Sequence, residues 1–192
     1  MARTPTVEIP LGFTAPDFRL PEPLTGKMIS LNGVRGQSGI VVMFICNHCP
    51  FVVHVREELI RVANDFMSKG IGFVAISPND VTNCPDDAPA LMAELARSFP
   101  FLYLSDETQE VAKAYTAACT PDISVFDAQM KCVYRGQLDG SRPGNSVVCD
   151  GRDLRAVLAA LVEGHAVSAE QVPSIGCNIK WKPGNEPGYY FH

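Results

Sequence analysis

Two cysteines separated by two residues have the clearest capacity for chemistry in this chain. Cys46 and Cys49 enclose Asn-His and directly follow the apolar run Gly39–Ile45. That run predicts a strand buried on both faces of a sheet, and apolar spacing over 51–69 predicts an amphipathic helix after the pair. A helix N-terminus presents free N–H groups and about half a positive charge, which together stabilise a thiolate. We therefore predict Cys46 as the nucleophile and Cys49, one turn further in and less exposed, as the resolving thiol.

The spacing of this pair supports thiol–disulfide exchange. Cys46 would attack a substrate disulfide, and Cys49 would then resolve the mixed disulfide and leave the pair oxidised. His48 adds a second positive influence on the thiolate when it is protonated. Zinc sites use the same spacing but need a second pair of ligands, and the remaining cysteines contain no second such pair. We therefore expect a catalytic dithiol with no metal and no cofactor.

A second group of residues lies before a later predicted strand. Cys119, Thr120 and Pro121 directly precede the strand predicted at Ile123–Phe126. Cys119 is a candidate third thiol near the pair, although a free cysteine is most often a small buried hydrophobe. Asp80 follows the buried strand predicted at 71–76, at the edge of the sheet where α/β sites gather, so it is a candidate proton carrier for Cys49.

The other elements must position these groups. Residues 1–37 predict an irregular arm with a short hairpin, and the chain then alternates strands and helices before a last hairpin and helix. This order is typical of an α/β sheet with a mixed edge. The further predicted elements are strands 18–20, 28–31, 101–104 and 131–134, a helix from a cap at Asp86 or Asp87 to Ser98, and helices 108–115 and 152–162. We expect one domain over 1–165 and an aromatic, Pro- and Gly-rich tail over 166–192 that packs on it or on a second copy in a homodimer.

Composition limits the classes of partner. The net charge is −5 without any Lys/Arg run, so we expect no nucleic-acid partner. No apolar run is long enough to cross a membrane, and residues 1–20 lack a secretion signal. Seven cysteines, an odd number, then predict free thiols in a reducing cytoplasm. Cys177 is predicted to be a buried free thiol, with a disulfide to Cys149 or to a partner chain as the alternative.

Several motifs resemble a known family. Ala15-Pro-Asp-Phe18, the strand into Cys46–Cys49 and Thr120-Pro121-Asp122 resemble the thioredoxin-like branch of the AhpC/TSA (peroxiredoxin) superfamily. Bacterial thioredoxin family proteins with a Cys-Asn-His-Cys dithiol are a closer match, through 44–50, 134–139 and 174–185. The resemblance covers nearly the whole chain. It implies a thioredoxin fold, in which helices flank a central mixed sheet that carries an N-terminal hairpin extension and a C-terminal tail. It also implies a cis proline at Pro121, where Thr120 faces the dithiol and can pair its backbone with a substrate chain.

The resemblance leaves three functions open. The first is a thiol–disulfide oxidoreductase with thioredoxin or glutathione as electron donor and some antioxidant activity. The second is a thiol peroxidase with Cys46 peroxidatic and Cys49 resolving. Met43 stands where a peroxiredoxin has Thr or Ser, and only Arg135 or Arg142 could fold back to stabilise peroxide. The third is Cu(I) binding by the dithiol with Cys119 or His48.

Overall fold

The structure is a computed structural model that describes residues 3–190. Positions 1–2 of the predicted arm and positions 191–192 of the predicted tail lie outside the described residues. Within the described part, five strands form the central sheet, in the order β6-β5-β4-β8-β9. β4 is parallel to β5 and β5 to β6, whereas β8 and β9 run antiparallel, so the predicted mixed sheet is confirmed. These strands are β4 (Gly39–Phe44), β5 (Ile71–Ser77), β6 (Leu102–Ser105), β8 (Asp122–Asp127) and β9 (Cys132–Gly136).

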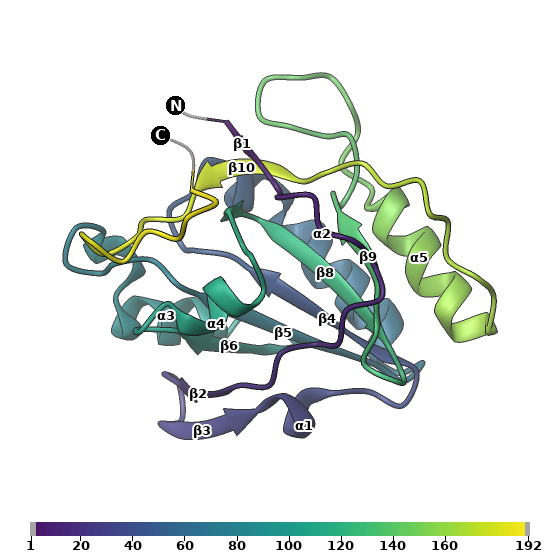
Figure 1. The fold of residues 1–192 in the computed structure, drawn as a ribbon, viewed down its shortest axis with the longest axis horizontal. Coiled ribbons are helices and arrows are strands. Elements are labelled where there is room, and N and C mark those ends of the chain that lie inside the picture. Colours follow the sequence, from purple (N-terminus) through teal and green to yellow (C-terminus); the bar gives the residue numbers. More distant parts are fainter. Residues whose placement is uncertain (1–2, 191–192) are drawn as a thin grey trace.

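Both faces of this sheet are covered (Figure 1). One face packs on α2 (Pro50–Met67), α3 (Pro89–Ala96) and α5 (Arg152–Glu163). The other packs on the N-terminal arm, α4 and the tail. The arm contains β2 (Arg19–Glu22), β3 (Lys27–Ser30) and α1 (Leu31–Val34), and α4 (Glu110–Ala114) follows β6. Helices on both faces of a mixed sheet give the thioredoxin fold that the sequence predicted.

The residue pattern of β4 and α2 explains how they pack. Every residue of β4 is buried, and alternate side chains enter the two cores, with Val41 and Met43 on the α2 side. On α2, the buried positions include Val55, Leu59 and Val62, which recur at helical spacing and form one apolar face. Because this face lies on the sheet next to β4, the loop between the two elements is held at both ends.

A small second sheet joins the two ends of the chain. It contains β1 (Thr4–Pro5), β10 (Ile175–Asn178) and β7 (Cys119–Thr120), with β10 in the middle. Figure 1 shows β10 beside β1, close to both termini. The tail continues past β10 with Ile179 and Trp181 buried in the core on the α4 side. These strands were not predicted, because β1 and β7 have only two residues each and β10 contains a glycine within the Pro- and Gly-rich tail.

One predicted helix begins differently. The chain forms a short 3-10 helix, η1 (Pro85–Asp87), and then α3, whose N-cap residue is Ala88. The prediction that Asp86 or Asp87 caps this helix is therefore wrong. Asp87 is completely buried, and its carboxylate is turned toward the loop that holds the two cysteines.

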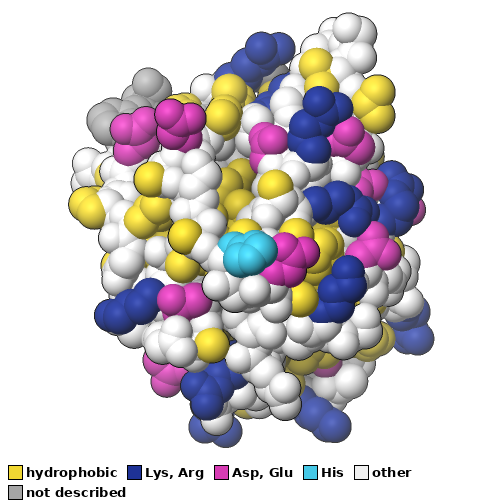
Figure 2. Space-filling view, turned by 90° about the vertical axis from the view of Figure 1, so that its right-hand side faces the viewer, with side chains coloured by type: hydrophobic (Ala, Val, Ile, Leu, Met, Phe, Trp, Pro, Cys, Tyr) yellow, Lys and Arg dark blue, Asp and Glu magenta, His cyan; other side chains and the backbone are white. Residues whose placement is uncertain are grey.

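The surface carries mixed charge. On the face shown in Figure 2, basic and acidic side chains lie interspersed among hydrophobic ones. Among residues 3–190, no helix combines the length and the apolar character needed to cross a bilayer.

Burial of α2 can be tested by truncating one side chain. Leu59 is 1% exposed, so Leu59→Ala should lower the free energy of unfolding by about 2–5 kcal/mol through lost burial and a residual cavity. Leu91→Ala is the matched control, because Leu91 is 41% exposed and its truncation should change stability by less than about 0.5 kcal/mol. Urea denaturation measures both variants. Equal effects of the two substitutions would contradict the packing described here.

Candidate active site

The dithiol lies in the loop between β4 and α2. β4 ends at Phe44 and α2 begins at Pro50, with Cys49 as its N-cap residue. The Cys49 carbonyl oxygen accepts the first helical hydrogen bond from Val53 N, at 2.9 Å. Cys46 therefore precedes the helix instead of opening it, and Cys49 occupies the positive helix end. The predicted helix over 51–69 begins within one residue of this start, where Pro50 suits the first helical position, but the expectation that Cys46 opens the helix and Cys49 lies one turn further in is wrong.

Both sulfur-bearing residues are buried. Cys46 is 1% exposed and Cys49 is 0% exposed, so the predicted difference in exposure between them is almost absent. Both belong to the core that includes the buried face of α2. The half-buried residues of the loop are Asn47 and His48, which lie between the two cysteines. Access to the dithiol therefore depends on this loop and on the segments around it.

Thr120 and Pro121 face the dithiol, as predicted, and the peptide bond between them is cis. Thr120 contacts both sulfurs with different atoms. Its hydroxyl oxygen lies 3.6 Å from Cys46 Sγ, and its carbonyl oxygen accepts a hydrogen bond from the Cys49 thiol at 3.1 Å. The fold thus brings the dithiol pair Cys46 and Cys49 together with the pair Thr120 and Pro121, although the two pairs are about 70 positions apart in the chain.

The two thiols ionise as one unit. A hydrogen bond from the Cys46 thiol lowers the pKa of Cys49 to about 4, despite the opposing effect of burial. The same hydrogen bond raises the pKa of Cys46 far above its usual value, and burial and the negative charge of Asp87 raise it further. The pair therefore holds one thiolate and one shared proton over the neutral range. With the proton on Cys46, Cys49 is the anion; with the proton on Cys49, that thiol donates to the Thr120 carbonyl.

Asp87 is the functional residue that the sequence analysis missed. Its carboxylate accepts hydrogen bonds from Asn47 N at 2.7 Å and from Asn79 Nδ2 at 2.8 Å. His48 Nδ1 lies 2.9 Å from Asp87 Oδ2, and the two form an ion pair when His48 is protonated. The charge on His48 therefore acts through Asp87 as well as on the thiolate. The only sequence signal at Asp87 was its position before a helix, which indicated a cap.

Asp80 does not take the predicted role of proton carrier for Cys49. Its carboxylate accepts hydrogen bonds from Thr82 N and Asn83 Nδ2 and so closes its own turn. The carboxylate that lies beside Cys46 belongs to Asp87. The loop that follows β5 still contributes to the site, because the side-chain amide of Asn79 donates to Asp87.

Asn47 holds the dithiol loop in place through three hydrogen bonds. Its backbone N–H donates to Asp87, and its side-chain amide donates to the Asp86 carbonyl at 2.8 Å. The Tyr103 hydroxyl donates to Asn47 Oδ1 at 3.1 Å. These partners come from η1 and β6, so two segments distant in the chain position the loop.

Two further thiols lie around the proline loop. Cys119 is fully buried, which agrees with the alternative of a small buried hydrophobe, and its Sγ lies 3.5 Å from the Pro121 carbonyl oxygen. Cys177 is a free thiol, as predicted, but it is half-buried in β10 and packs against the core that contains Cys46 and Cys49. Cys177 also stands opposite Thr120 in the antiparallel pairing of β10 with β7. The backbone of Thr120 that was predicted to pair with a substrate chain is therefore paired with the tail of this chain.

The arginines named as candidates for binding peroxide are engaged elsewhere. Arg135 donates to the carbonyl oxygens of Tyr115 and Thr116, and it faces Asp122 at 3.6 Å. Arg142 donates to the carbonyl oxygens of Asp139 and Ser141. These contacts engage Arg135 in the fold, whereas Arg142 lines the hollow beside Pro121 and its Nε has no hydrogen-bond partner among the described residues.

One group of residues has the composition of a metal site. Within the described chain, Cys46, His48 and Asp87 each offer a ligand atom, and these atoms lie within 4.8 Å of one another. This set mixes sulfur, nitrogen and oxygen, whereas Cu(I) prefers sulfur. Asp87 also already accepts two hydrogen bonds from the protein. The geometry suits proton transfer at least as well as metal binding.

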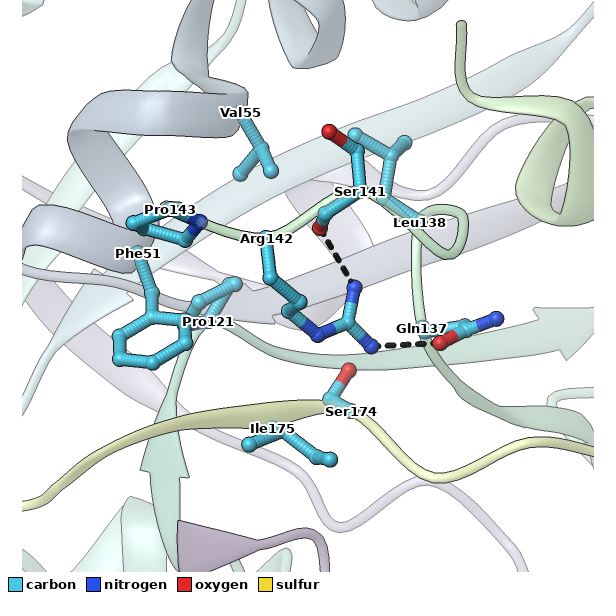
Figure 3. Close-up of a pocket in the computed structure, with 10 residues that line it drawn as sticks. All are labelled: Phe51, Val55, Pro121, Gln137, Leu138, Ser141, Arg142, Pro143, Ser174 and Ile175. Carbon is cyan, nitrogen blue, oxygen red and sulfur yellow. Dashed lines mark hydrogen bonds between the residues drawn. The ribbon is translucent and has the colours of Figure 1, made fainter. Parts of the chain in front are cut away.

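A hollow lies beside the cis proline (Figure 3). Phe51 and Val55 of α2 line one side of it, and Ser174 and Ile175 of the tail line another. Pro121 also lines it, next to the Thr120 that contacts the dithiol. The lining is mainly apolar, and the remaining residues come from the loop 137–143: Gln137, Leu138, Ser141, Arg142 and Pro143.

Comparisons with known proteins agree with this geometry. The family model described as Redoxin matches residues 10–154. An uncharacterised conserved protein from Geobacillus kaustophilus is 53% identical, with a TM-score of 0.94 over 96% of this chain and 98% of that one. A hypothetical protein from Sinorhizobium meliloti is 43% identical, with a TM-score of 0.92 over 94% of this chain and 100% of that one. A search of curated proteins gave no match.

More distant structures share the fold alone. A putative thiol:disulfide interchange protein DsbE from Chlorobium tepidum is 19% identical, with a TM-score of 0.62. This similarity covers 81% of this chain and 99% of that one.

The shared proton predicts a distinctive pH titration. Ultraviolet thiolate absorbance should remain at neutral pH and disappear only as the pH falls through about 4, because the folded protein stabilises the Cys49 anion. Cys46→Ala removes the main hydrogen bond to that anion, so its titration should move upward toward the ordinary thiol pKa of about 8.5. Cys132→Ala is the control, since Cys132 donates to the Tyr134 carbonyl and should leave the titration unchanged. An unshifted titration in Cys46→Ala would contradict the coupling.

Proposed function

The chain belongs to the redoxin family, and on that premise we propose that it is a thiol–disulfide oxidoreductase working through Cys46 and Cys49. The observation that carries the proposal is the buried pair of thiols that both contact Thr120, beside a cis proline. The thiolate of the pair lies on Cys49, so Cys46 becomes the nucleophile that disulfide exchange needs when the shared proton moves from Cys46 to Cys49.

The reaction begins with transfer of the shared proton from Cys46 to the Cys49 thiolate. The Thr120 hydroxyl, 3.6 Å away, can donate to the new Cys46 thiolate, while the Cys49 thiol donates to the Thr120 carbonyl. Cys46 then attacks one sulfur of the substrate disulfide, and the other sulfur leaves as a thiolate. The leaving thiolate needs a proton, which the Cys49 thiol can supply.

Resolution follows once Cys49 is again an anion. The Cys49 thiolate attacks the Cys46 sulfur, a Cys46–Cys49 disulfide forms, and the second substrate sulfur leaves as a thiolate. Two electrons have then passed from the dithiol to the substrate. His48 and Asp87 lie beside Cys46, and they can supply or accept the proton of the departing group. We propose thioredoxin or glutathione as the donor that reduces the disulfide again.

The hollow beside Pro121 is the proposed approach for the substrate. It lies between the start of α2 and the tail, and at about 10 Å³ it has room for about one water molecule, so a substrate sulfur reaches the dithiol only after the loop 137–143 or the tail moves aside. A peroxidase function has less support, because the hydrogen bonds of Arg135 and Arg142 go to neighbouring carbonyl groups. Arg142 lines the hollow, but of its guanidinium nitrogens only Nε is without a hydrogen-bond partner among the described residues, so the cationic donor left for a peroxide oxygen is this one group.

Removing either thiol of the pair tests the proposal. Cys46→Ser should reduce the rate of insulin disulfide reduction to that of the uncatalysed reaction, because the sulfur that forms the mixed disulfide is gone and the remaining Cys49 is completely buried, within reach of a small oxidant such as oxidised glutathione but not of a protein disulfide. Cys49→Ser should accumulate the mixed disulfide on Cys46, visible by mass spectrometry. Cys132→Ser, which alters a buried thiol in β9, should keep full activity. Activity retained in Cys46→Ser would reject the proposal.

The charge of Asp87 should tune the reduction potential. Asp87 disfavours the Cys46 thiolate, so Asp87→Asn should lower the pKa of Cys46 and stabilise the reduced form. The potential should therefore become more oxidising, with a rise of about 30 mV for each 1.4 kcal/mol. Asp86→Asn is the matched control, because Asp86 is exposed and should leave the potential unchanged. Equilibration with glutathione buffers measures both, and a fall in the Asp87→Asn potential would contradict the assignment.

A further inference from the structure

The tail strand β10 lies directly against the proline loop of the site. Cys177 stands opposite Thr120, and Asn178 stands opposite Cys119. β1 pairs with the other edge of β10, where Thr4 stands opposite Gly176. β10 is therefore held from both sides and is not a loose terminal segment.

The approach of β10 to the site is unusually close, and it depends on a glycine. A Cβ atom on Gly176 would lie 2.0 Å from the Thr120 carbonyl oxygen and 2.5 Å from its carbon, closer than real Cβ contacts. Any side chain at Gly176 would push β10 away from Thr120. The carbonyl that accepts the hydrogen bond from Cys49 is the same one that Gly176 approaches.

Anchors on both sides hold Cys177 in place. Before it, the Ser174 hydroxyl donates to the Gly136 carbonyl at 2.7 Å, and Thr6 N donates to the Ser174 carbonyl at 2.9 Å. After it, Ile179 is fully buried and Lys180 N donates to Asn79 Oδ1 at 2.9 Å. Cys177 thus keeps a defined position against the core that contains the dithiol.

Cys177 is the partly exposed member of a group of three thiols. Its side chain packs against the core that contains Cys46 and Cys49, and it stands opposite Thr120, whose carbonyl accepts the hydrogen bond of the Cys49 thiol. The dithiol itself is almost completely buried, whereas Cys177 is half-buried. A disulfide that reached Cys177 would therefore be more accessible to a second protein than one confined to Cys46 and Cys49.

We propose that Cys177 is a third redox thiol, which receives the disulfide from the Cys46–Cys49 pair. The Cys177 sulfur attacks the Cys49 sulfur, so a Cys49–Cys177 bond forms and the Cys46–Cys49 bond breaks. Its electron pair returns to Cys46, which takes up the proton released by Cys177. The step consumes no oxidant, because the number of disulfides is unchanged. It rests on the proposed function, which supplies the first disulfide.

The electrostatics favour this order of events. In the reduced protein, burial and the hydrogen bond with Cys49 raise the pKa of Cys177 to about 12, so Cys177 is an unreactive thiol. Oxidation of Cys49 removes its negative charge and that hydrogen bond. Lys180, whose positive charge favours the Cys177 thiolate, remains in place. Cys177 therefore becomes easier to ionise once the disulfide has formed on the pair.

Disulfide mapping tests the proposal directly. Oxidised glutathione is added to full-length wild type and to Cys46→Ser, followed by acid quenching, tryptic digestion and mass spectrometry without reduction. Cleavage after lysine and arginine places Cys49 on the peptide 36–56 and Cys177 alone on the peptide 156–180. In Cys46→Ser, these two peptides should be joined by a Cys49–Cys177 disulfide, since the Cys177 thiol displaces glutathione from Cys49. Cys149→Ser in the same background is the control and should leave the link unchanged.

The result that would overturn the proposal is a stable glutathione adduct on Cys49 of Cys46→Ser, with Cys177 still a free thiol. The wild-type sample separates this failure from failure of the proposed function. A Cys46–Cys49 disulfide there, with insulin reduction intact, leaves the oxidoreductase standing while the third thiol is rejected. Wild type that forms no Cys46–Cys49 disulfide would reject the proposed function itself.

A variant that keeps both Cys49 and Cys177 provides the second test. Gly176→Ala in the Cys46→Ser background should slow formation of the Cys49–Cys177 disulfide at least tenfold, because the added Cβ displaces β10 from Thr120. Gly188→Ala is the matched control, since a Cβ there meets no atom within 4 Å. Thermal unfolding confirms that both variants are folded. An unchanged rate in folded Gly176→Ala would contradict the placement of Cys177.

Discussion

Thr120 makes the contacts on which the rest of the site depends. Its carbonyl oxygen accepts the hydrogen bond of the Cys49 thiol, and its hydroxyl lies beside Cys46. Its backbone also pairs with β10, opposite Cys177. One residue therefore sets the positions of three sulfurs. The cis bond to Pro121 is part of the turn that presents Thr120 in this way.

A buried carboxylate supports the other side of the site. Removing a charge from water is costly unless hydrogen bonds and opposite charge offset the loss. Asp87 meets that requirement through Asn47, Asn79 and His48. Because Asn47 belongs to the dithiol loop, the same hydrogen bonds that satisfy Asp87 also fix that loop. Asp87 therefore acts on Cys46 in two ways: its negative charge raises the pKa of that thiol, and its hydrogen bond to Asn47 N holds the loop.

The accuracy of the sequence analysis follows the length and regularity of each element. β4 and α2 were predicted within a few residues, because a continuous apolar run and a long helical stripe are strong local signals. The start of α2 was predicted to within one residue, but the expectation that Cys49 lies one turn inside the helix was wrong, since Cys49 is the N-cap residue. β1 and β7 were not predicted because each has only two residues, and β10 was not because it lies in the Pro- and Gly-rich tail. Asp87 was interpreted as a helix cap, because its true partners lie far away in the sequence.

The sequence by itself determined the α/β class and the dithiol, because these depend on local patterns and short motifs, while the thioredoxin fold and the proline loop facing the dithiol were implied by the family resemblance. Only the tertiary structure decided which groups surround the sulfurs. Asp87 reaches Asn47 across 40 positions, and Cys177 reaches Thr120 through strand register. Neither contact has a local signature, since each arises from the way distant segments pack. The physical reason is that burial and charge at a site are properties of neighbours in space, and neighbours in space are set by the complete fold.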